Sequence, residues 1–178
     1  ISFGVAREFR DEPHMSIFFL KRPLEVGAQS VSILSLRIFN YSDKFAPNGK
    51  TVIQAIIETE WNYWNTLRGN VPRYEAEKKR LAREVLNRLE DHYPGLSSQV
   101  EVTDIATPFT SWRYTLNHRG SSMGWLMTSK TIMAQAPNTL PGLKNFYMAG
   151  QWVLSGGSVP GCIYSGRRAV QMLCRQDR

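Results

Sequence analysis

Alternating apolar and polar residues dominate the first sixty positions and predict a β-sheet. The runs richest in β-branched and aromatic residues are 16–20, 30–39 and 51–57. Turn-forming residues such as Pro23 and Pro47 separate them. Within the middle run, Leu34, Leu36 and Ile38 fall on one side of the strand, which is the more uniformly apolar side. Because antiparallel sheets commonly pack only one face on a core, we expect an antiparallel meander that is covered on one face.

The apolar period changes to that of a helix after Pro72. Leu81, Val85 and Leu89 recur every four residues, and charged residues of both signs fill the opposite face. This pattern predicts an amphipathic helix over about 73–92. The mixed signs indicate a solvated face rather than a surface for nucleic acid.

Residues 100–107 have the pattern of a further strand that ends at Pro108, since proline has no backbone N–H and biases its predecessor toward extended geometry. Aromatic residues then accumulate. Trp112, Tyr114 and Trp125 are candidates to line a pocket for a long apolar molecule, because ligand sites are mostly apolar with few polar groups. Each of them is also compatible with ordinary core packing.

The last thirty-odd residues predict a strand, a glycine-rich loop and a helix, in that order. A short apolar run at 146–149 precedes Gly150, the loop contains Gly157 and Gly161, and an apolar-periodic helix begins near Pro160. Free N–H groups and the positive end of the helix dipole favour a negatively charged or electron-rich partner there. The alternative is a glycine loop that only caps the helix.

Three stretches in this region form a motif: Tyr147-Met-Ala-Gly-Gln-Trp, Gly156-Gly-Ser-Val-Pro-Gly and Ser165-Gly-Arg. They resemble the carboxyl-terminal flavin motif of FAD-dependent oxidoreductases related to phytoene desaturase, carotenoid isomerase and retinol saturase. Weaker landmarks in the order of that family are Phe45-Ala-Pro-Asn-Gly-Lys, Pro94-Gly-Leu and Ala106-Thr-Pro-Phe-Thr-Ser-Trp-Arg-Tyr-Thr. Together these stretches span most of the chain.

The resemblance implies an α+β fold in two parts. Residues 1–144 would form an antiparallel or mixed β-sheet region with helical cover that binds substrate, and 145–178 the last strand and helix of a Rossmann-like FAD domain. The sequence contains no Gly-x-Gly-x-x-Gly motif, which cradles a dinucleotide pyrophosphate, and it begins without methionine. We therefore expect the carboxyl-terminal part of a longer flavoprotein, without the amino-terminal dinucleotide-binding half.

The resemblance also implies FAD as the cofactor of the intact protein. Gly150 and Gln151 would lie at the ribityl or pyrophosphate region, with Gln151 standing where many flavoproteins have an acidic residue. The residues expected beside the flavin pyrimidine edge are Gly157, Ser158, Val159, Pro160 and Gly161. The N–H groups of Ser158, Val159 and Gly161 would stabilise negative charge on the reduced ring, whereas proline has none to offer. The chain alone is expected to lack FAD and to be inactive.

The reaction implied for the intact protein is hydride transfer between FAD and a polyene, carotenoid-like or other lipid substrate, as desaturation, saturation or redox isomerisation. A flavin amine oxidase is one alternative, and a non-catalytic module for an apolar ligand or a partner protein is another. The sequence identifies no catalytic side chain. It shows no metal-binding signature, and the three histidines have no ligand-like spacing.

Charge and composition limit the kinds of partner and the cellular location that we expect. The net charge of +7 comes from scattered basic residues, which argues against nucleic acid. Cys162 and Cys174 fall on different faces of one predicted helix, so they cannot pair with each other, and a reducing compartment is the default. No apolar run approaches the roughly 20 residues of a membrane span. We expect an apolar small-molecule substrate, a cytoplasmic or peripheral membrane location, and self-association through an exposed cofactor face.

Overall fold

The computed structural model describes residues 1–131, 136–154 and 157–176. They belong to two compact units, an amino-terminal unit Ile1–Gly120 and a carboxyl-terminal unit Ser121–Arg178. This division by packing differs from the boundary between residues 144 and 145 expected above, which divided the chain by role into substrate and cofactor regions.

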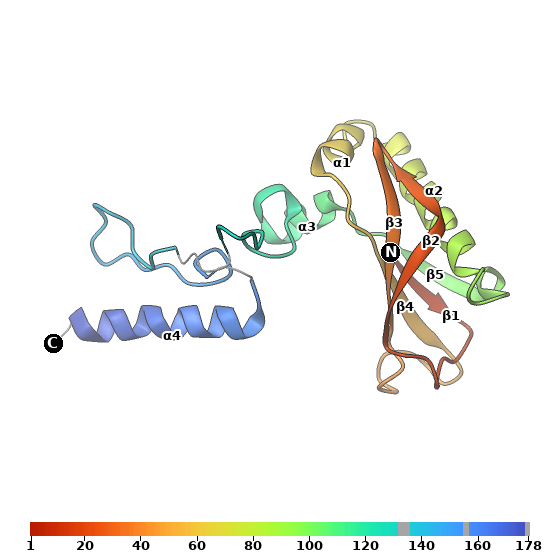
Figure 1. The fold of residues 1–178 in the computed structure, drawn as a ribbon, viewed down its shortest axis with the longest axis horizontal. Helices are drawn as coiled ribbons and strands as arrows, with labels where there is room; N and C mark the ends of the chain where they lie inside the picture. Colours follow the sequence, from red (N-terminus) through yellow and green to blue (C-terminus); the bar gives the residue numbers. More distant parts are fainter. Residues whose placement is uncertain (132–135, 155–156, 177–178) are drawn as a thin grey trace. The chain divides into compact units, whose positions relative to one another are not determined.

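A five-stranded antiparallel sheet forms the larger part of the amino-terminal unit (Figure 1). Its strands are β1 (Ser2–Val5), β2 (Met15–Val26), β3 (Gln29–Ile38), β4 (Thr51–Ile56) and β5 (Val100–Asp104). Their order in the sheet is β2-β3-β4-β1-β5, and each neighbouring pair is antiparallel. The expected α+β class with an antiparallel sheet is therefore confirmed.

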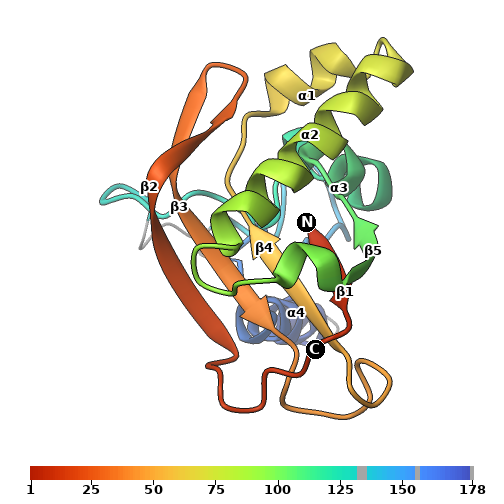
Figure 2. The same ribbon diagram turned by 90° about the vertical axis from the view of Figure 1, so that its right-hand side faces the viewer.

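One face of this sheet packs on the hydrophobic core, as the period of two predicts. Leu34 and Leu36 of β3 are fully buried, whereas Ile33 on the opposite face is 49% exposed. Helix α2 (Val71–Leu89) lies across the covered face (Figure 2). Its buried Val85 and Leu89 join the same core cluster, and each such side chain contributes roughly 1.5–3 kcal/mol by leaving water.

Local signals explain where the helices of this unit begin. The side chain of Asn70 accepts a hydrogen bond from the Arg73 N–H at 3.1 Å and caps α2. Thr107 and Thr110 form a capping box in front of α3 (Pro108–Thr115). The expected strand at 100–107 is thus shorter, because the Thr107 cap and Pro108 already belong to a helix start. The remaining elements are α1 (Trp61–Leu67) and the 3₁₀ turns Leu96–Gln99 and His118–Gly120.

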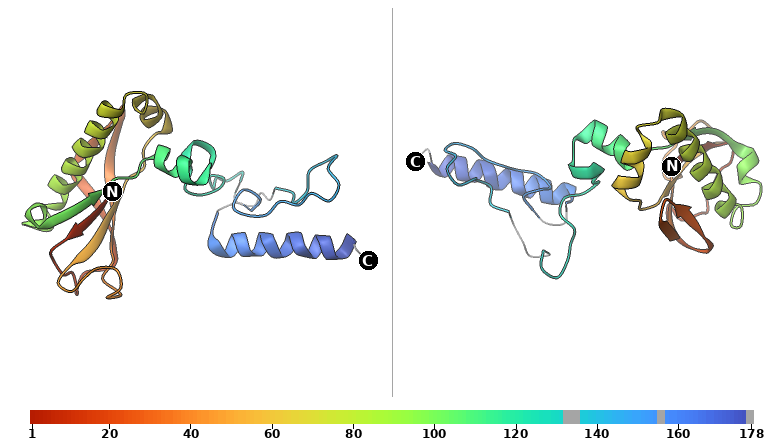
Figure 3. Two further views of the ribbon diagram at one scale, coloured as in Figure 1. Left: turned by 180° about the vertical axis from the view of Figure 1, so that it is seen from behind. Right: turned by 90° about the horizontal axis from the view of Figure 1, so that it is seen from above.

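The carboxyl-terminal unit contains one long helix, α4 (Val159–Gln176), which matches the helix expected near Pro160. Extended and turning segments lie along this helix (Figure 3). Residues 146–149, for which the sequence predicts a strand, do not form one here. A strand needs hydrogen-bonded neighbours along its length. In this stretch the Met148 N–H donates to the Asn138 carbonyl at 2.6 Å.

Helices able to cross a bilayer are not found in the described part of the chain, since each is too short or too polar.

Candidate functional site

The hydroxyl of Ser165 ties the two halves of the glycine motif together. Ser165 lies on α4 and is 2% exposed. Its Oγ accepts a hydrogen bond from the Gly150 N–H at 2.7 Å and donates to the Cys162 carbonyl at 3.1 Å. The Gly150 turn is therefore held against the beginning of α4.

Asn138 holds the segment that leads into this turn. It is also 2% exposed, and its Nδ2 donates to the Met148 carbonyl at 2.8 Å and, more weakly, to the Ser165 carbonyl at 3.5 Å. Its Oδ1 is buried and has no hydrogen-bond partner among the residues that the structure describes. A buried orphan acceptor of this kind is costly, which marks the surroundings of the Gly150 turn as a place where a further donor would be stabilising.

Two glycines of the motif have conformations or contacts that other residues do not tolerate. Gly150 has φ 110°, a value that L side chains rarely adopt, and open space lies where its Cβ would stand. Gly157 has φ 33°, and a Cβ there would lie 2.7 Å from the Gly124 backbone nitrogen. The first glycine thus leaves room for a ligand to approach the backbone, and the second allows two chain segments to meet.

The start of α4 offers fewer free donors than the sequence analysis expected. Ser158 caps the helix, because its Oγ accepts the Gly161 N–H at 3.1 Å and its carbonyl accepts the Cys162 N–H at 2.8 Å. The Gly161 amide is therefore already used. Among the described residues no acceptor pairs with the amides of Ser158 and Val159, and Pro160 has no backbone N–H to donate. These two amides at the positive end of α4 are the donors available to an anionic or electron-rich ring.

Trp125, one of the three aromatic substrate candidates, lies against the glycine motif in the carboxyl-terminal unit. Its Nε1–H donates to the Trp152 carbonyl at 2.9 Å, and the two indole rings meet edge to face at 5.4 Å. The preceding Gly124 packs its Cα against the Gln151 carbonyl so closely that no Cβ would fit. The sequence analysis did not identify Gly124 as a site residue, because a local pattern cannot predict a contact with a residue 27 positions away.

The other two aromatic candidates belong to α3 in the amino-terminal unit. The Trp112 ring stacks on Phe109 at 5.6 Å, and the Arg68 guanidinium lies over both rings. Tyr114 is 77% exposed and has Arg113 above its ring. Trp112 therefore takes part in a local aromatic cluster, whereas Tyr114 presents its ring to solvent.

The sheet face opposite α2 carries an apolar surface that the sequence analysis did not single out. We call it the outer sheet face. Its large exposed residues on β2, β3 and β4 are Met15 (49%), Ile17 (57%), Phe19 (79%), Ile33 (49%) and Ile56 (38%). Phe19 lies directly opposite Ile33 across the β2–β3 pair. The sequence did contain a signal for this surface, because β2 is apolar on both faces. Phe18 and Leu20 pack toward the core, so the apolar residues that alternate with them must lie on the outer face.

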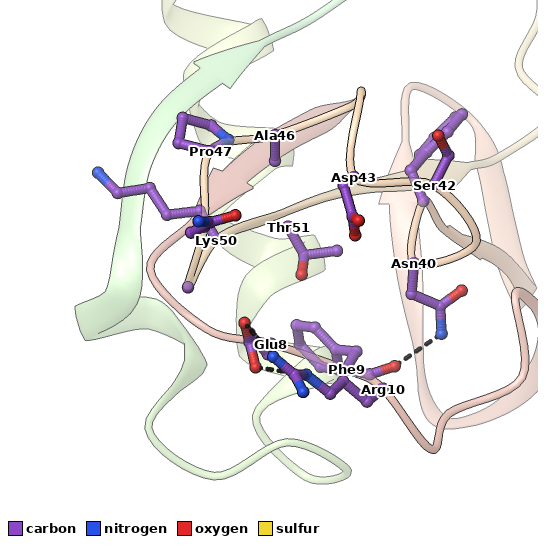
Figure 4. A pocket seen from close by; sticks show the side chains of 13 residues that line it. Glu8, Phe9, Arg10, Asn40, Ser42, Asp43, Ala46, Pro47, Lys50 and Thr51 are labelled. Atoms are coloured by element: carbon purple, nitrogen blue, oxygen red, sulfur yellow. Dashed lines mark hydrogen bonds and ion pairs between the residues drawn. The ribbon is translucent and has the colours of Figure 1, made fainter.

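A polar hollow of about 570 Å³ lies at the end of the sheet where the loop before β4 turns back (Figure 4). Asp43 and the buried Thr51 point into it, and Glu8 pairs with Arg10 at 2.7 Å on its floor. The hydrogen bond from Arg10 lowers the pKa of the Glu8 carboxyl. Over the described residues, no three side chains of His, Cys, Asp or Glu come together as a metal would require.

A comparison with protein families places most of the chain in one family. The family model for flavin containing amine oxidoreductases matches residues 4–174. This range covers the sheet, α2 and the motif from Tyr147 to α4. No match to a curated protein is found.

Proposed function

Because the chain belongs to the family of flavin-containing amine oxidoreductases, we propose that the intact protein is an FAD-dependent oxidoreductase whose substrate is a polyene, carotenoid-like or other lipid. The proposal places it on the branch of phytoene desaturase, carotenoid isomerase and retinol saturase, whose motif its carboxyl terminus resembles. The outer sheet face is the single observation that carries the substrate class.

That face suits a hydrocarbon better than a charged molecule. Phe19 and Ile17 leave most of their surface in water, and an exposed apolar patch of this kind commonly marks a binding surface. The charged residue opposite Met15 on the same face is Arg37. A guanidinium repels a protonated amine, whereas it does not hinder a neutral carbon chain.

The glycine motif supports FAD as the cofactor. When bound, FAD supplies the two-electron hydride chemistry that this reaction needs. Gly150 leaves open space beside its backbone, and the amides of Ser158 and Val159 lie at the positive end of α4. Those amides would stabilise negative charge on the reduced ring. Gln151 would offer a neutral side chain to a ribityl hydroxyl in place of an acidic one.

A flavin amine oxidase is the second candidate, and the matching family is compatible with it as well. A non-catalytic module for an apolar ligand is the third. The visible spectrum of the full-length protein, purified under mild conditions, distinguishes the three. The proposed function predicts a flavin band that bleaches under anaerobic addition of a polyene that donates hydride, or a reduced flavin whose band returns when the polyene accepts hydride. Bleaching by a primary amine alone would indicate an amine oxidase, and a colourless protein that FAD cannot reconstitute would indicate the binding module.

Substitution on the outer sheet face tests the substrate class itself. Phe19→Gln should raise KM for a polyene about tenfold, because burying a phenylalanine ring contributes roughly 1.5–3 kcal/mol. The matched control is Val71→Gln, at the start of α2, where the side chain is 66% exposed and lies away from this face. An unchanged KM in Phe19→Gln would refute the assignment of this surface to substrate.

A further inference from the structure

We propose that Met123, Gly124 and Trp125 form a clamp that positions the glycine loop of the cofactor site, with Trp125 as its positioning residue. This inference rests on the proposed function. It assigns to Trp125 the role of holding the loop in position, in place of the direct contact with substrate that the sequence suggests.

The clamp contacts the loop on both sides. Before the loop, the Gly124 backbone packs against the Gln151 carbonyl with no room for a side chain. After the loop, a Cβ on Gly157 would lie 2.7 Å from the Gly124 nitrogen and 3.3 Å from the Met123 Cβ. Gly124 therefore lies between the two stretches, and each of the three backbones limits the movement of the others.

Trp125 adds a directional bond to this steric contact. Its indole N–H donates to the Trp152 carbonyl at 2.9 Å, and its ring meets the Trp152 ring at an angle of 85°. The side chain remains 56% exposed, so burial in a core does not explain its position. The hydrogen bond and the ring contact both hold the turn that follows Gly150.

The clamp also affects the backbone N–H donors at the start of α4. Gly157 directly precedes Ser158 and Val159, whose amides have no acceptor among the described residues. Fixing Gly157 against Gly124 fixes the direction of those amides. A loosened clamp should weaken binding of the flavin, and it should lower the reduction potential, because stabilisation of the reduced, negatively charged ring is lost.

The test compares three variants of the full-length protein with the wild type. Trp125→Phe keeps a ring and removes the N–H donor. Gly124→Ala adds the Cβ for which there is no room. The matched control is Trp61→Phe, which makes the same chemical change on α1, where Trp61 takes part in the Trp112 cluster. Circular dichroism and thermal unfolding confirm that each variant folds.

Two readouts decide the proposal. Backbone hydrogen exchange over residues 150–154 and 157–161 should speed up about tenfold in Trp125→Phe and further in Gly124→Ala, with Trp61→Phe unchanged. The Kd for FAD should rise about tenfold in Trp125→Phe, as expected for one lost hydrogen bond, and the potential of its bound flavin should fall. Exchange no faster than wild type in folded Trp125→Phe, or a wild-type Kd in both clamp variants, would overturn the proposal.

Failure of the proposed function gives a different result. A wild-type protein that binds no FAD would refute the flavoenzyme assignment, yet hydrogen exchange over the loop would still report on the clamp. Slower or unchanged exchange in folded Trp125→Phe refutes the clamp even where FAD binding is normal.

Discussion

The buried hydroxyl of Ser165 accepts a hydrogen bond from the backbone N–H of Gly150 at 2.7 Å. The two residues are fifteen positions apart, one at the end of the Met148-Ala-Gly stretch and the other on α4. This bond joins the first and last parts of the motif that relates the chain to flavoproteins. The spacing between these parts therefore has a structural reason, in addition to any contact that either part makes with a ligand.

Ser165→Ala should destabilise the carboxyl-terminal unit by about 1–3 kcal/mol, because it leaves the Gly150 N–H without its acceptor. The Gly150 turn would then move more freely, and binding of FAD should weaken in parallel. Urea unfolding and a fluorescence titration with FAD measure the two effects. Ser98→Ala is the control, since the Ser98 hydroxyl bonds to Gly95 on an exposed turn and such changes cost at most about 0.5 kcal/mol. Equal losses in the two variants would contradict the role of Ser165.

The sequence predicts those elements whose signal is local and repeated. The alternation in 30–39 corresponds to β3, the fourfold spacing of Leu81, Val85 and Leu89 corresponds to α2, and the apolar period after Pro160 corresponds to α4. Each of these segments is ten residues or longer, so its pattern is repeated several times. The burial of Leu34 and Leu36 follows from the same pattern.

Elements that are stabilised by residues distant in the sequence cannot be predicted from a local pattern. Strand β1 has only four residues, and it is defined by its pairing with β4 and β5 from much later in the chain. Helix α1 has seven residues, several of them aromatic or asparagine, which are weak helix formers. Burial of Trp64 and Leu67 stabilises it instead. In the candidate site, residue types and motif spacing indicate the glycines, but the contact between Gly124 and Gln151 requires the folded chain.

Gly27→Ala should destabilise the amino-terminal unit by roughly 2–3 kcal/mol. Gly27 turns the hairpin between β2 and β3 with φ 63°, and an added Cβ would lie 2.6 Å from the Tyr63 ring. Backbone strain contributes about 1 kcal/mol and overpacking the rest. Gly49→Ala isolates the strain, because Gly49 has φ 78° with nothing within 4 Å of its Cβ position. Urea denaturation should therefore separate the two variants by at least about 1 kcal/mol, and equal losses would refute the clash with Tyr63.

Glu77 should make the amino-terminal unit sensitive to acid. Its carboxylate accepts two bonds from Arg80, at 2.7 and 2.8 Å, and one from the Tyr63 hydroxyl at 2.7 Å. The Arg80 hydrogen bonds, foremost, lower the pKa of Glu77 below its usual 4.5. The unfolded chain then binds a proton before the folded one does, so the free energy of unfolding falls as pH decreases below about 4.5.

Glu77→Gln tests this link. It should lose about 1–2 kcal/mol of stability at pH 7, because the charged hydrogen bonds are weakened, and its stability should decline less steeply between pH 5 and about 3. Glu75→Gln is the control, since the Glu75–Lys78 pair lies at the surface with the carboxylate 47% exposed and such pairs contribute at most about 1 kcal/mol. A Glu77→Gln profile parallel to that of the wild type would show that another carboxylate dominates acid unfolding.

Tyr93 should produce the opposite dependence at alkaline pH. Its side chain is 5% exposed, packs edge to face on Phe9 at 5.3 Å, and donates its hydroxyl proton to Glu12 at 3.3 Å. Burial, followed by the negative charge of Glu12, raises the pKa of Tyr93 to about 12 from its ordinary 10. The unfolded chain therefore releases the phenolic proton first. Stability from this group is complete below pH 10, and it is lost as pH rises from 10 toward 12.

Tyr93→Phe removes the titration while keeping the ring in place. Stability near pH 7 should change by at most about 1 kcal/mol, the usual contribution of one neutral hydrogen bond. The decline in the free energy of unfolding between pH 10 and 12 should become shallower, because one group that ionises earlier in the unfolded chain is gone. Urea unfolding at several pH values gives both quantities, and phenolate absorbance of the folded protein reports the ionisation itself. An alkaline decline as steep in Tyr93→Phe as in the wild type would assign the effect to the other tyrosines, among which Tyr63 also has a pKa raised by burial.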